Sequence, residues 1–521
     1  MATRTSSKEK SLAAAIDVGS HETVMRIAEM HMGKAPIDIE VVHRTLPLGS
    51  DTYSEGRISQ ALLDQLIKIL QSFKQKLAEY GDIPVVITAT SSFREASNVA
   101  YGVDQIRRCT GFEIDVLPNS IETSLHLLGL AATLQHYRDV VNETTLIVDI
   151  RAGSIQLSLY DQGTLINSLN FRIGALRVRE LLGDLERQAI DYSALLAEFI
   201  GGDLTYYTTL GPKRTTYKHV IVIGGNVRFM RHLLKMEPAE SSVDVSAFKE
   251  MYAHLADRNE TVPRFADIPD EHRTLLLPTA IIVDEVVRHA GVDTIIMPKF
   301  SLSSCLLHDI AVRRFKLKVP YDMEADLISS ARQVARRYRT DKRHAMRVET
   351  LALTLFDLTK KMHGLKKEER LCLQLAAILH NVGKYIAIQD DGSGTLAVLS
   401  ATEFIGLTPE RKQLVSLLAC FHNGHVSISE YHVRQLPEPM RLVLMKLIAI
   451  LCVANALDAG HAGKIQLIRA KQTERGLALT YEASADETLE RWHFMKHSPF
   501  FRNVFGVEPY LVKRQARETE A

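Results

Sequence analysis

The spacing of apolar and polar positions changes twice along the 521 residues. Up to about residue 310, short runs of Ala, Ile, Leu and Val that are typical of buried strands alternate with segments whose apolar residues recur at helical spacing. From there to about residue 465 the pattern is almost wholly helical. It then predicts strands in KIQLIRA and GLALTYEA, a helix from about Ala485 and a closing strand near residues 507–512. Each change of period predicts a domain boundary.

Two of the predicted strand pairs share one design. AAAIDVGSHETVMRIAE from Ala13 and LIVDIRAGSIQLSLY from Leu146 each place an acid, Asp17 or Asp149, after an apolar run and follow it with small residues. Such turns let backbone N–H groups approach phosphate oxygens, and each Asp suits a hydrated Mg²⁺. The repeat, with a third strand and turn in VIVIGGNVRFM, predicts a phosphate-binding cleft. The small turn residues are Gly19, Ser20, Gly153, Ser154, Gly224 and Gly225.

Composition narrows the class of protein. Hydrophobic residues make up 46% and charged residues 24%, the balance of a globular chain, and the length suggests three or four domains. A net charge of +1 gives no whole-chain attraction to nucleic acid or membrane. Five cysteines without a CxxC pair, and the lack of an apolar leader, indicate a cytoplasmic protein. The most apolar helical run, from Leu442, is interrupted by Lys446 and Asn455, so we expect no membrane span.

Four segments carry a resemblance to a known family: DVGSHE from Asp17, ATSSFREASN from Ala89, NSIETSLHLLG from Asn119 and DIRAGSIQ from Asp149. In these the sequence resembles the Ppx/GppA phosphatases, which comprise exopolyphosphatases and guanosine-pentaphosphate phosphohydrolases, over essentially the whole chain. The resemblance implies an α/β fold with two actin-like, ribonuclease-H-like domains, then a helical HD-like domain and a small α+β domain. The corresponding ranges are 11–132, 133–310, 311–470 and 471–521.

The resemblance also implies roles for residues. Glu122 would be the base that orients and deprotonates the attacking water, and Asp17 and Asp149 would hold Mg²⁺. The phosphate-binding residues would be Gly19, Ser20, Arg94, Arg151, Gly153, Ser154, Gly224, Gly225 and Asn226. Without the resemblance, Glu122 fits a solvated acid that opens a helix capped by Ser120, and Arg94 fits a surface or ion-paired arginine.

The second loop departs from the family pattern. Arg151 and Ala152 stand where the family has glycines, and Gln156 replaces a glutamate. The bulk of an arginine restricts close backbone approach, and a neutral amide binds Mg²⁺ less strongly than a carboxylate. His21 also replaces an asparagine in the first loop. We therefore expect slower turnover than in the family, or none.

The helical region has a second resemblance, to HD-type domains, whose metal-dependent members gather histidines and aspartates from several helices. His344, His380 and Asp458 have suggestive spacing, but the defining His-Asp pair has become His380-Asn381. Losing that carboxylate removes charge that a hard cation needs, so we expect no metal there.

A local positive stripe also appears in this region. Between Arg313 and Arg347 the sequence contains eleven Lys or Arg residues and only four acidic residues. The stripe would guide a polyphosphate chain toward the cleft, or it is a solvated helix face with ordinary ion pairs. Few aromatic residues accompany it, which argues against single-stranded nucleic acid as a partner.

The resemblance to the Ppx/GppA phosphatases implies a hydrolase that releases terminal orthophosphate from inorganic polyphosphate, with guanosine pentaphosphate as a candidate second substrate and Mg²⁺ as cofactor. The alternative is a catalytically impaired protein that binds polyphosphate or guanosine alarmones for regulation. A sugar or acetate kinase is disfavoured because such kinases lack the segment from Arg94 to Asn98. The family resemblance further implies a homodimer.

Overall fold

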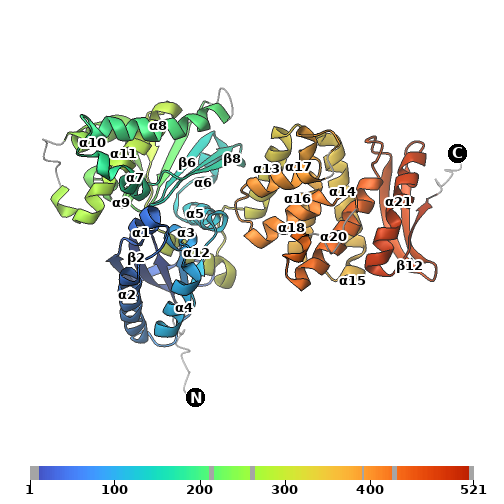
Figure 1. Cartoon of the computed structure of the whole chain (residues 1–521), viewed down its shortest axis with the longest axis horizontal. Helices are drawn as coiled ribbons and strands as arrows, with labels where there is room; N and C mark the ends of the chain where they lie inside the picture. The colour runs from blue at the N-terminus through green and yellow to red at the C-terminus, as the bar shows by residue number, and fades with distance from the viewer. Residues whose placement is uncertain (1–10, 211–215, 258–264, 390–391, 425–430, 515–521) are drawn as a thin grey trace, which may run out of the picture. The chain divides into compact units, whose positions relative to one another are not determined.

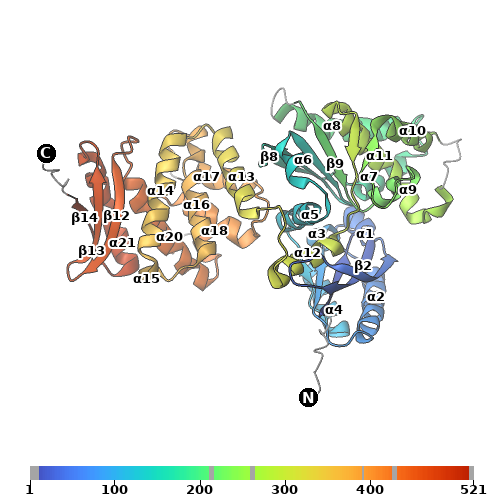
Figure 2. The same cartoon turned by 180° about the vertical axis from the view of Figure 1, so that it is seen from behind.

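The computed structural model describes residues 11–210, 216–257, 265–389, 392–424 and 431–514. The chain divides into two compact units at residue 323. The first unit contains two mixed sheets covered by helices, and the second contains helices and a small sheet (Figures 1 and 2). The α/β class predicted from the sequence is confirmed.

The two sheets of the first unit repeat one plan. In the first, the strand order is β3-β2-β1-β4-β5, with β1, β2 and β3 antiparallel and β1, β4 and β5 parallel. In the second, β8-β7-β6-β9-β11 has the same order and β10 adds an antiparallel edge. The strands are β1 Ser11–Val18, β2 Glu22–Met30, β3 Ile37–Thr45, β4 Val85–Ala89, β5 Asp115–Val116, β6 Thr145–Ile150, β7 Ile155–Asp161, β8 Thr164–Phe171, β9 His219–Ile223, β10 Ser242–Asp244 and β11 Thr294–Ile296.

Helices connect the parallel strands and cover both faces of the sheets. Long apolar faces at helical spacing, such as the one in α2, bury Leu and Phe side chains against the strands. The helices are α1 Leu48–Glu55, α2 Gln60–Ala78, α3 Ser91–Glu95, α4 Val99–Thr110, α5 Asn119–Thr133, α6 Tyr137–Asn142, α7 Ala175–Leu182, α8 Tyr192–Leu210, α9 Val227–Leu233, α10 Val245–Ala256, α11 Asp270–Ala290 and α12 Leu302–Phe315.

Strand β1 is buried on both faces, and its alternation assigns each face a different partner. Ile16 belongs to the core shared with α2 and α4, whereas Ala13 and Ala15 belong to a core shared with α12. Helix α12 comes after the second sheet in the chain, yet it packs against β1, β2 and α5. The second half of the unit therefore returns a helix to the first sheet.

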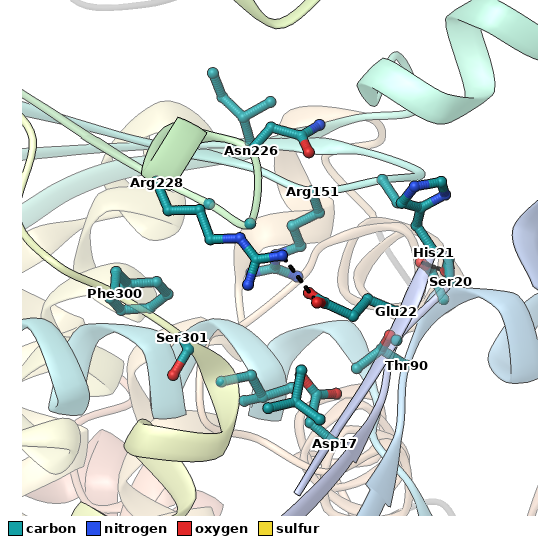
Figure 3. A pocket seen from close by; sticks show the side chains of 18 of the residues that line it. Asp17, Ser20, His21, Glu22, Thr90, Arg151, Asn226, Arg228, Phe300 and Ser301 are labelled. Atoms are coloured by element: carbon teal, nitrogen blue, oxygen red, sulfur yellow. Dashed lines mark hydrogen bonds and ion pairs between the residues drawn. The ribbon is translucent and has the colours of Figure 1, made fainter. Parts of the chain in front are cut away.

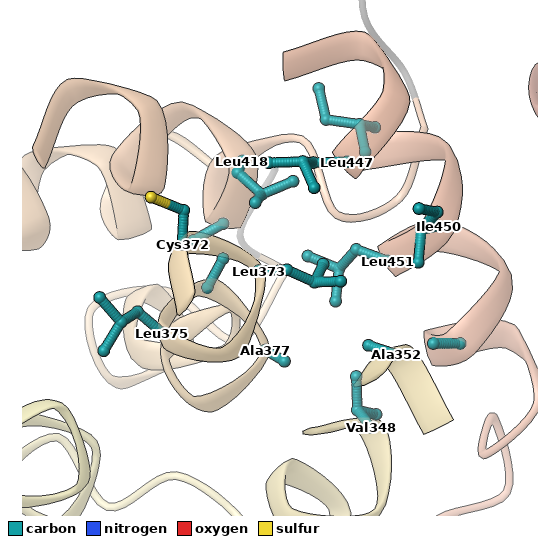
Figure 4. Packing of buried hydrophobic residues seen from close by; sticks show 14 of the residues in the cluster. Val348, Ala352, Cys372, Leu373, Leu375, Ala377, Leu418, Leu447, Ile450 and Leu451 are labelled. Carbon is teal, nitrogen blue, oxygen red and sulfur yellow. The ribbon is translucent and has the colours of Figure 1, made fainter. Parts of the chain in front are cut away.

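The second unit is helical up to a three-stranded sheet with the order β12-β13-β14. Its apolar core contains helical residues such as Val348, Leu373, Leu418 and Leu451 (Figure 4). The same core also includes residues of the strands of that sheet. The elements are α13 Met323–Arg337, α14 Lys342–Leu358, α15 Lys360–His363, α16 Lys367–Leu379, the 3₁₀ helix η3 Val382–Tyr385, α17 Ser393–Ala401, α18 Pro409–Cys420, α19 Tyr431–Arg434, α20 Glu438–Ala456, β12 Ile465–Thr473, β13 Gly476–Ala483, α21 Thr488–Phe505 and β14 Pro509–Lys513.

Helix α20 is long and apolar enough, by length and composition alone, to cross a membrane. In the structure it packs against α14, α16, α18 and α21 and supplies fully buried residues such as Leu447 and Ile450 to the core. Its apolar composition is therefore explained by its place at the centre of the second unit.

The predicted succession of elements is confirmed. The helical stretch, the two strands that follow it, the helix near residue 485 and the closing strand all occur where the pattern placed them. The predicted boundaries at residues 132, 310 and 470 stay predictions.

Candidate active site

The turns that follow β1, β6 and β9 meet around one pocket of about 160 Å³ in the first unit (Figure 3). Each of these strands is a buried apolar run that ends in small residues, so the topology brings three loops from distant parts of the sequence to one place. Most of the residues that the sequence nominated line this pocket: Asp17, Gly19, Ser20, Glu122, Asp149, Arg151, Gly224, Gly225 and Asn226.

Glu122 lies in the first turn of α5 and is only 3% exposed. Its Oε2 accepts a hydrogen bond from Nη1 of Arg94 at 2.9 Å and lies 3.3 Å from Nη1 of Arg151. Burial alone would raise the pKa of Glu122, but the charges of Arg151 and Arg94 outweigh burial and lower it. The side chain is therefore a buried, ionised carboxylate at the pocket, and not a solvated helix-opening acid.

Arg151 joins Glu122 to the second aspartate. Its Nε and Nη2 lie 2.7 and 2.6 Å from Oδ2 of Asp149, and its remaining donors bond to Asn119 and Thr123. Burial would raise the pKa of Asp149, yet Arg151, together with a 2.6 Å contact from Nδ1 of His126, lowers it to about 2. The arginine that departs from the family pattern thus places its positive charge between two carboxylates.

Asp17 has the opposite electrostatics. Its side chain lines the pocket, and burial, followed by the nearby charges of Glu122 and Glu22, raises its pKa well above the usual range. Its Oδ1, like Oδ1 of Asp149, is buried without a hydrogen-bond partner. A cation beside these two oxygens would satisfy both atoms and return Asp17 to its ionised form.

Mg²⁺ fits this donor set in a limited way. Magnesium is commonly held by one or two carboxylates, with the remaining positions taken by water and substrate phosphates. Asp17 and Asp149 supply two such carboxylates. Among the described residues no group of three or more His, Cys, Asp or Glu side chains is placed to hold a metal, so substrate and water would complete the shell.

The charge of the lining also bears on its ligand. Four acids, Asp17, Glu22, Glu122 and Asp149, face the pocket with two arginines, Arg151 and Arg228. With the histidines neutral, the lining therefore carries an excess of negative charge. A polyphosphate would meet repulsion unless a cation or protonated histidines offset that excess.

Ser20 is held by other side chains of the protein. Its Oγ lies 2.9 Å from Oγ of Ser91 and accepts hydrogen bonds from Oη of Tyr53 at 3.0 Å and from the backbone N of Ser92 at 3.0 Å. This network ties the first loop to the start of α3. The side chain therefore positions the loop, and a phosphate contact from Ser20 would have to come from its backbone.

Three other nominated residues lie outside the pocket lining: Arg94, Gly153 and Ser154. Arg94 instead bonds to the carbonyl of Leu117 and to Glu122. A Cβ on Gly153 would lie 2.3 Å from Oη of Tyr53, so the second loop packs against the first half of the unit. The phosphate-binding role proposed for these three residues stays a prediction.

Gln156 also differs from a metal ligand in its surroundings. It is buried, its Oε1 accepts from the amides of Asn119 and Asn170, and its Nε2 donates to Ser168 at 2.7 Å. Its hydrogen bonds are made within the protein. The expectation that this substitution weakens catalysis stays a prediction.

The third loop is shaped by Gly224. Its φ is +141°, and a Cβ would lie 2.1 Å from the carbonyl oxygen of Ile150, so only glycine fits between β9 and the end of β6. Gly225 has open space where a Cβ would lie, and Asn226 begins α9 with its amide 3.4 Å from Oγ1 of Thr279.

The sequence analysis missed an ion pair that crosses the pocket. Nη2 of Arg228, from α9, lies 2.8 Å from Oε1 of Glu22 on β2, which also contacts Nδ1 of His43 at 2.7 Å (Figure 3). Burial would raise the pKa of Glu22, but these two partners lower it to about 2. Each partner lies within three residues of a small-residue turn, in GSHE and GGNVR, but nothing in the local sequence pairs the two.

A second connection joins the two halves of the unit. Arg177 of α7 pairs with Glu95 at 2.7 Å, donates to the carbonyl of Gly153 at 2.7 Å, and stacks over the ring of Tyr53 at 4.2 Å. The cleft is therefore bridged through Arg177 and through Arg228.

Comparisons with known proteins identify the family. A profile described as Ppx/GppA phosphatase family matches residues 23–311, more than half of the chain, and one described as Ppx/GppA phosphatase, domain III, matches residues 328–497. The chain belongs to the Ppx/GppA phosphatase family. The predicted membership is confirmed over both units, whereas the HD-like character of the helical region stays a prediction.

Individual Ppx/GppA relatives are distant. The guanosine-5'-triphosphate,3'-diphosphate pyrophosphatases of Aeromonas hydrophila and Aeromonas salmonicida are each 22% identical over 418 residues, covering 78% of this chain and 80% of theirs. A solved exopolyphosphatase from Cytophaga hutchinsonii, 18% identical, covers 60% of this chain and 100% of its own with a TM-score of 0.51, which shows the shared fold. The predicted enzyme class, a phosphoanhydride hydrolase, is the class to which these relatives belong.

Proposed function

We propose that this protein is a phosphoanhydride hydrolase that releases terminal orthophosphate from inorganic polyphosphate and from the 5'-triphosphate of guanosine pentaphosphate. Membership of the family and the names of the relatives support the substrate class. The observation that carries the proposal is Glu122, a buried carboxylate that two arginines keep ionised beside Asp17 and Asp149 at the pocket.

In this proposal Glu122 acts on water. Its Oε2 is bonded to Arg94 and Arg151, so Oε1 would accept the proton of the water that attacks the terminal phosphorus. Arg94 and Arg151 fix the carboxylate in one orientation, which positions that water opposite the leaving phosphate.

The remaining side chains would bind the substrate. Nε of Arg228 is buried without a partner and would donate a hydrogen bond to a phosphate oxygen. Asp17 and Asp149 would hold Mg²⁺, which when bound neutralises phosphate charge. The proposal places the protein in the cytoplasm as a homodimer, a state that analytical ultracentrifugation would test.

The experiment is orthophosphate release by the full chain from long-chain polyphosphate and from guanosine pentaphosphate, with Mg²⁺. Glu122→Gln should abolish release, and Glu143→Gln, a matched change at an exposed glutamate that pairs with His219, should not. Release that survives in Glu122→Gln would refute the assignment of the base. No release by the unmodified chain would refute the hydrolase.

One observation favours a second candidate, a binder of polyphosphate or guanosine alarmones without turnover. The guanidinium of Arg151 already bonds to Asp149 and lies against Glu122, and Gln156 makes its hydrogen bonds within the protein. Saturable binding of polyphosphate or guanosine pentaphosphate in calorimetry, together with no orthophosphate release, would select this candidate.

A further inference from the structure

The second unit contains a larger pocket, of about 300 Å³, whose lining bears basic and neutral polar groups. Among the described residues, five histidines, three asparagines and two lysines line it, and no acid does. The groups come from several helices: His344 from α14, Lys384 from η3, Asn455 from α20 and Lys496 from α21. This is the region where the sequence suggested a lost metal site.

Two acids, Asp458 and Asp341, bond to histidines of the lining. Oδ2 of Asp458 lies 2.8 Å from Nδ1 of His344, and its Oδ1 accepts from the backbone N of Gly463 at 2.7 Å. Oδ2 of Asp341 lies 3.0 Å from Nδ1 of His461. These acids orient imidazoles, and their carboxylates are not part of the lining.

The electrostatics of the pocket are those of a site for an anion. Lys384 and Lys496 place two ammonium groups in the lining, beside the imidazoles of five histidines. Asn381, 91% buried, supplies a neutral amide where a metal site would need a carboxylate. Among the described residues no His, Cys, Asp and Glu group is placed to hold a metal.

The size of the pocket and the side chains that line it restrict the class of ligand. Phosphate oxygens are recognised by ammonium, amide and imidazole donors, all of which line the pocket. In the part of the chain that the structure describes, no Phe, Tyr or Trp side chain lines the pocket for a nucleobase to stack on. We propose that this pocket binds a short inorganic phosphate anion of one to three phosphoryl groups, at a site distinct from the cleft of the first unit.

The chain provides its own reporter for this site. Trp492 is the single tryptophan, its ring lies 4.8 Å from that of His493, and the ammonium of Lys496 lies 5.7 Å from its centre. An anion that draws Lys496 and His493 into the pocket would change the surroundings of the indole. The cleft of the first unit contains no tryptophan, so binding there has no direct effect on this fluorescence.

The test is a titration of the full chain with pyrophosphate in EDTA, followed by Trp492 emission and by calorimetry, at constant ionic strength. We expect a saturable change, and Lys384→Gln should weaken the affinity about tenfold because it removes one of two permanent charges. Lys471→Gln, at an exposed lysine on β12 outside the lining, is the matched control, and Lys384→Arg should restore most of the affinity.

Other outcomes decide against the proposal. It is overturned if neither emission nor heat saturates, or if Lys471→Gln weakens binding as much as Lys384→Gln. Binding of GTP without binding of pyrophosphate or tripolyphosphate would overturn the inorganic ligand. A fluorescence change that Arg228→Gln in the first unit abolishes would show that the response comes from the cleft, whereas its persistence there supports a separate site.

Discussion

Replacing Arg151 by glutamine tests whether its guanidinium stabilises the protein by neutralising two buried carboxylates of the cleft. The side chain is 6% exposed and lies against two buried carboxylates, those of Asp149 and Glu122. Glutamine keeps a shorter polar side chain and removes the charge. The change therefore leaves two ionised carboxylates with less compensation in a low-dielectric site.

The size of the effect follows from the partners that remain. Removing one member of a buried ion pair typically costs about 3–5 kcal/mol. Here Glu122 keeps Arg94 at 2.9 Å and Asp149 keeps His126 at 2.6 Å. We therefore expect Arg151→Gln to lower the free energy of unfolding by about 3 kcal/mol, at the lower end of that range.

Magnesium should partly restore the variant. If Arg151 supplies charge that a divalent cation would otherwise supply, its loss opens the carboxylates to Mg²⁺, and a ligand at a hundred times its Kd adds about 2.7 kcal/mol of stability. The assay is urea unfolding followed by circular dichroism, with and without Mg²⁺. Arg228→Gln is the control, since its side chain is 35% exposed and its loss should cost about 1 kcal/mol or less.

Two results would refute this reasoning. A loss below about 1 kcal/mol in Arg151→Gln, or an equal loss in Arg228→Gln, would show that the buried charge of Arg151 is not needed for stability. A variant whose stability does not respond to Mg²⁺ would show that the guanidinium does not stand in for a cation.

Three further predictions concern glycine, pH and thiols. Gly224→Ala should lower the free energy of unfolding by about 3 kcal/mol in urea, because its Cβ would lie 2.1 Å from the carbonyl oxygen of Ile150, whereas Gly202→Ala, with open space inside α8, should raise it by about 0.5–1 kcal/mol. Burial would raise the pKa of Glu22, but its histidine and arginine partners lower it from 4.5 to about 2. The stabilising effect of Glu22 is therefore present above pH 4.5 and is lost as the pH falls to about 2. The free energy of unfolding should fall less steeply with pH in Glu22→Gln over that range, and equal slopes would contradict the shift. Cys109 is the exposed thiol among the five cysteines, so a disulfide reagent should titrate one thiol in the native protein and five in urea, and rapid reaction of more than one would contradict the burial of the others.

Local pattern was sufficient for the elements of the fold. The alternation in GLALTYEA predicts a strand, and β13 occupies those residues, Gly476–Ala483. Local pattern does not predict where a helix packs, because an apolar face does not specify which surface covers it. The face of α12 predicts burial, but only the folded chain shows that it packs on β1, some 290 residues earlier.

The residues of the candidate site also differ in whether local sequence predicts their place. The repeated strand and turn placed Asp17 and Asp149 together, since equivalent strand ends meet in a duplicated fold. The pair Glu22 and Arg228 is separated by 206 positions, and no local spacing announces it. The hydroxyl network that occupies Ser20 escaped notice for the same reason, because it is completed by a tyrosine 33 residues away.

The return of α12 to the first sheet also constrains how the chain is made. Ala13 and Ala15 are buried by apolar residues of α12 that are translated almost 300 residues later. A nascent chain that ends before residue 302 therefore exposes one apolar face of its first sheet. The apolar face of the first sheet is fully covered only after the second sheet has been translated, so the two halves must fold together. Separate expression of residues 11–132 would yield an aggregation-prone fragment.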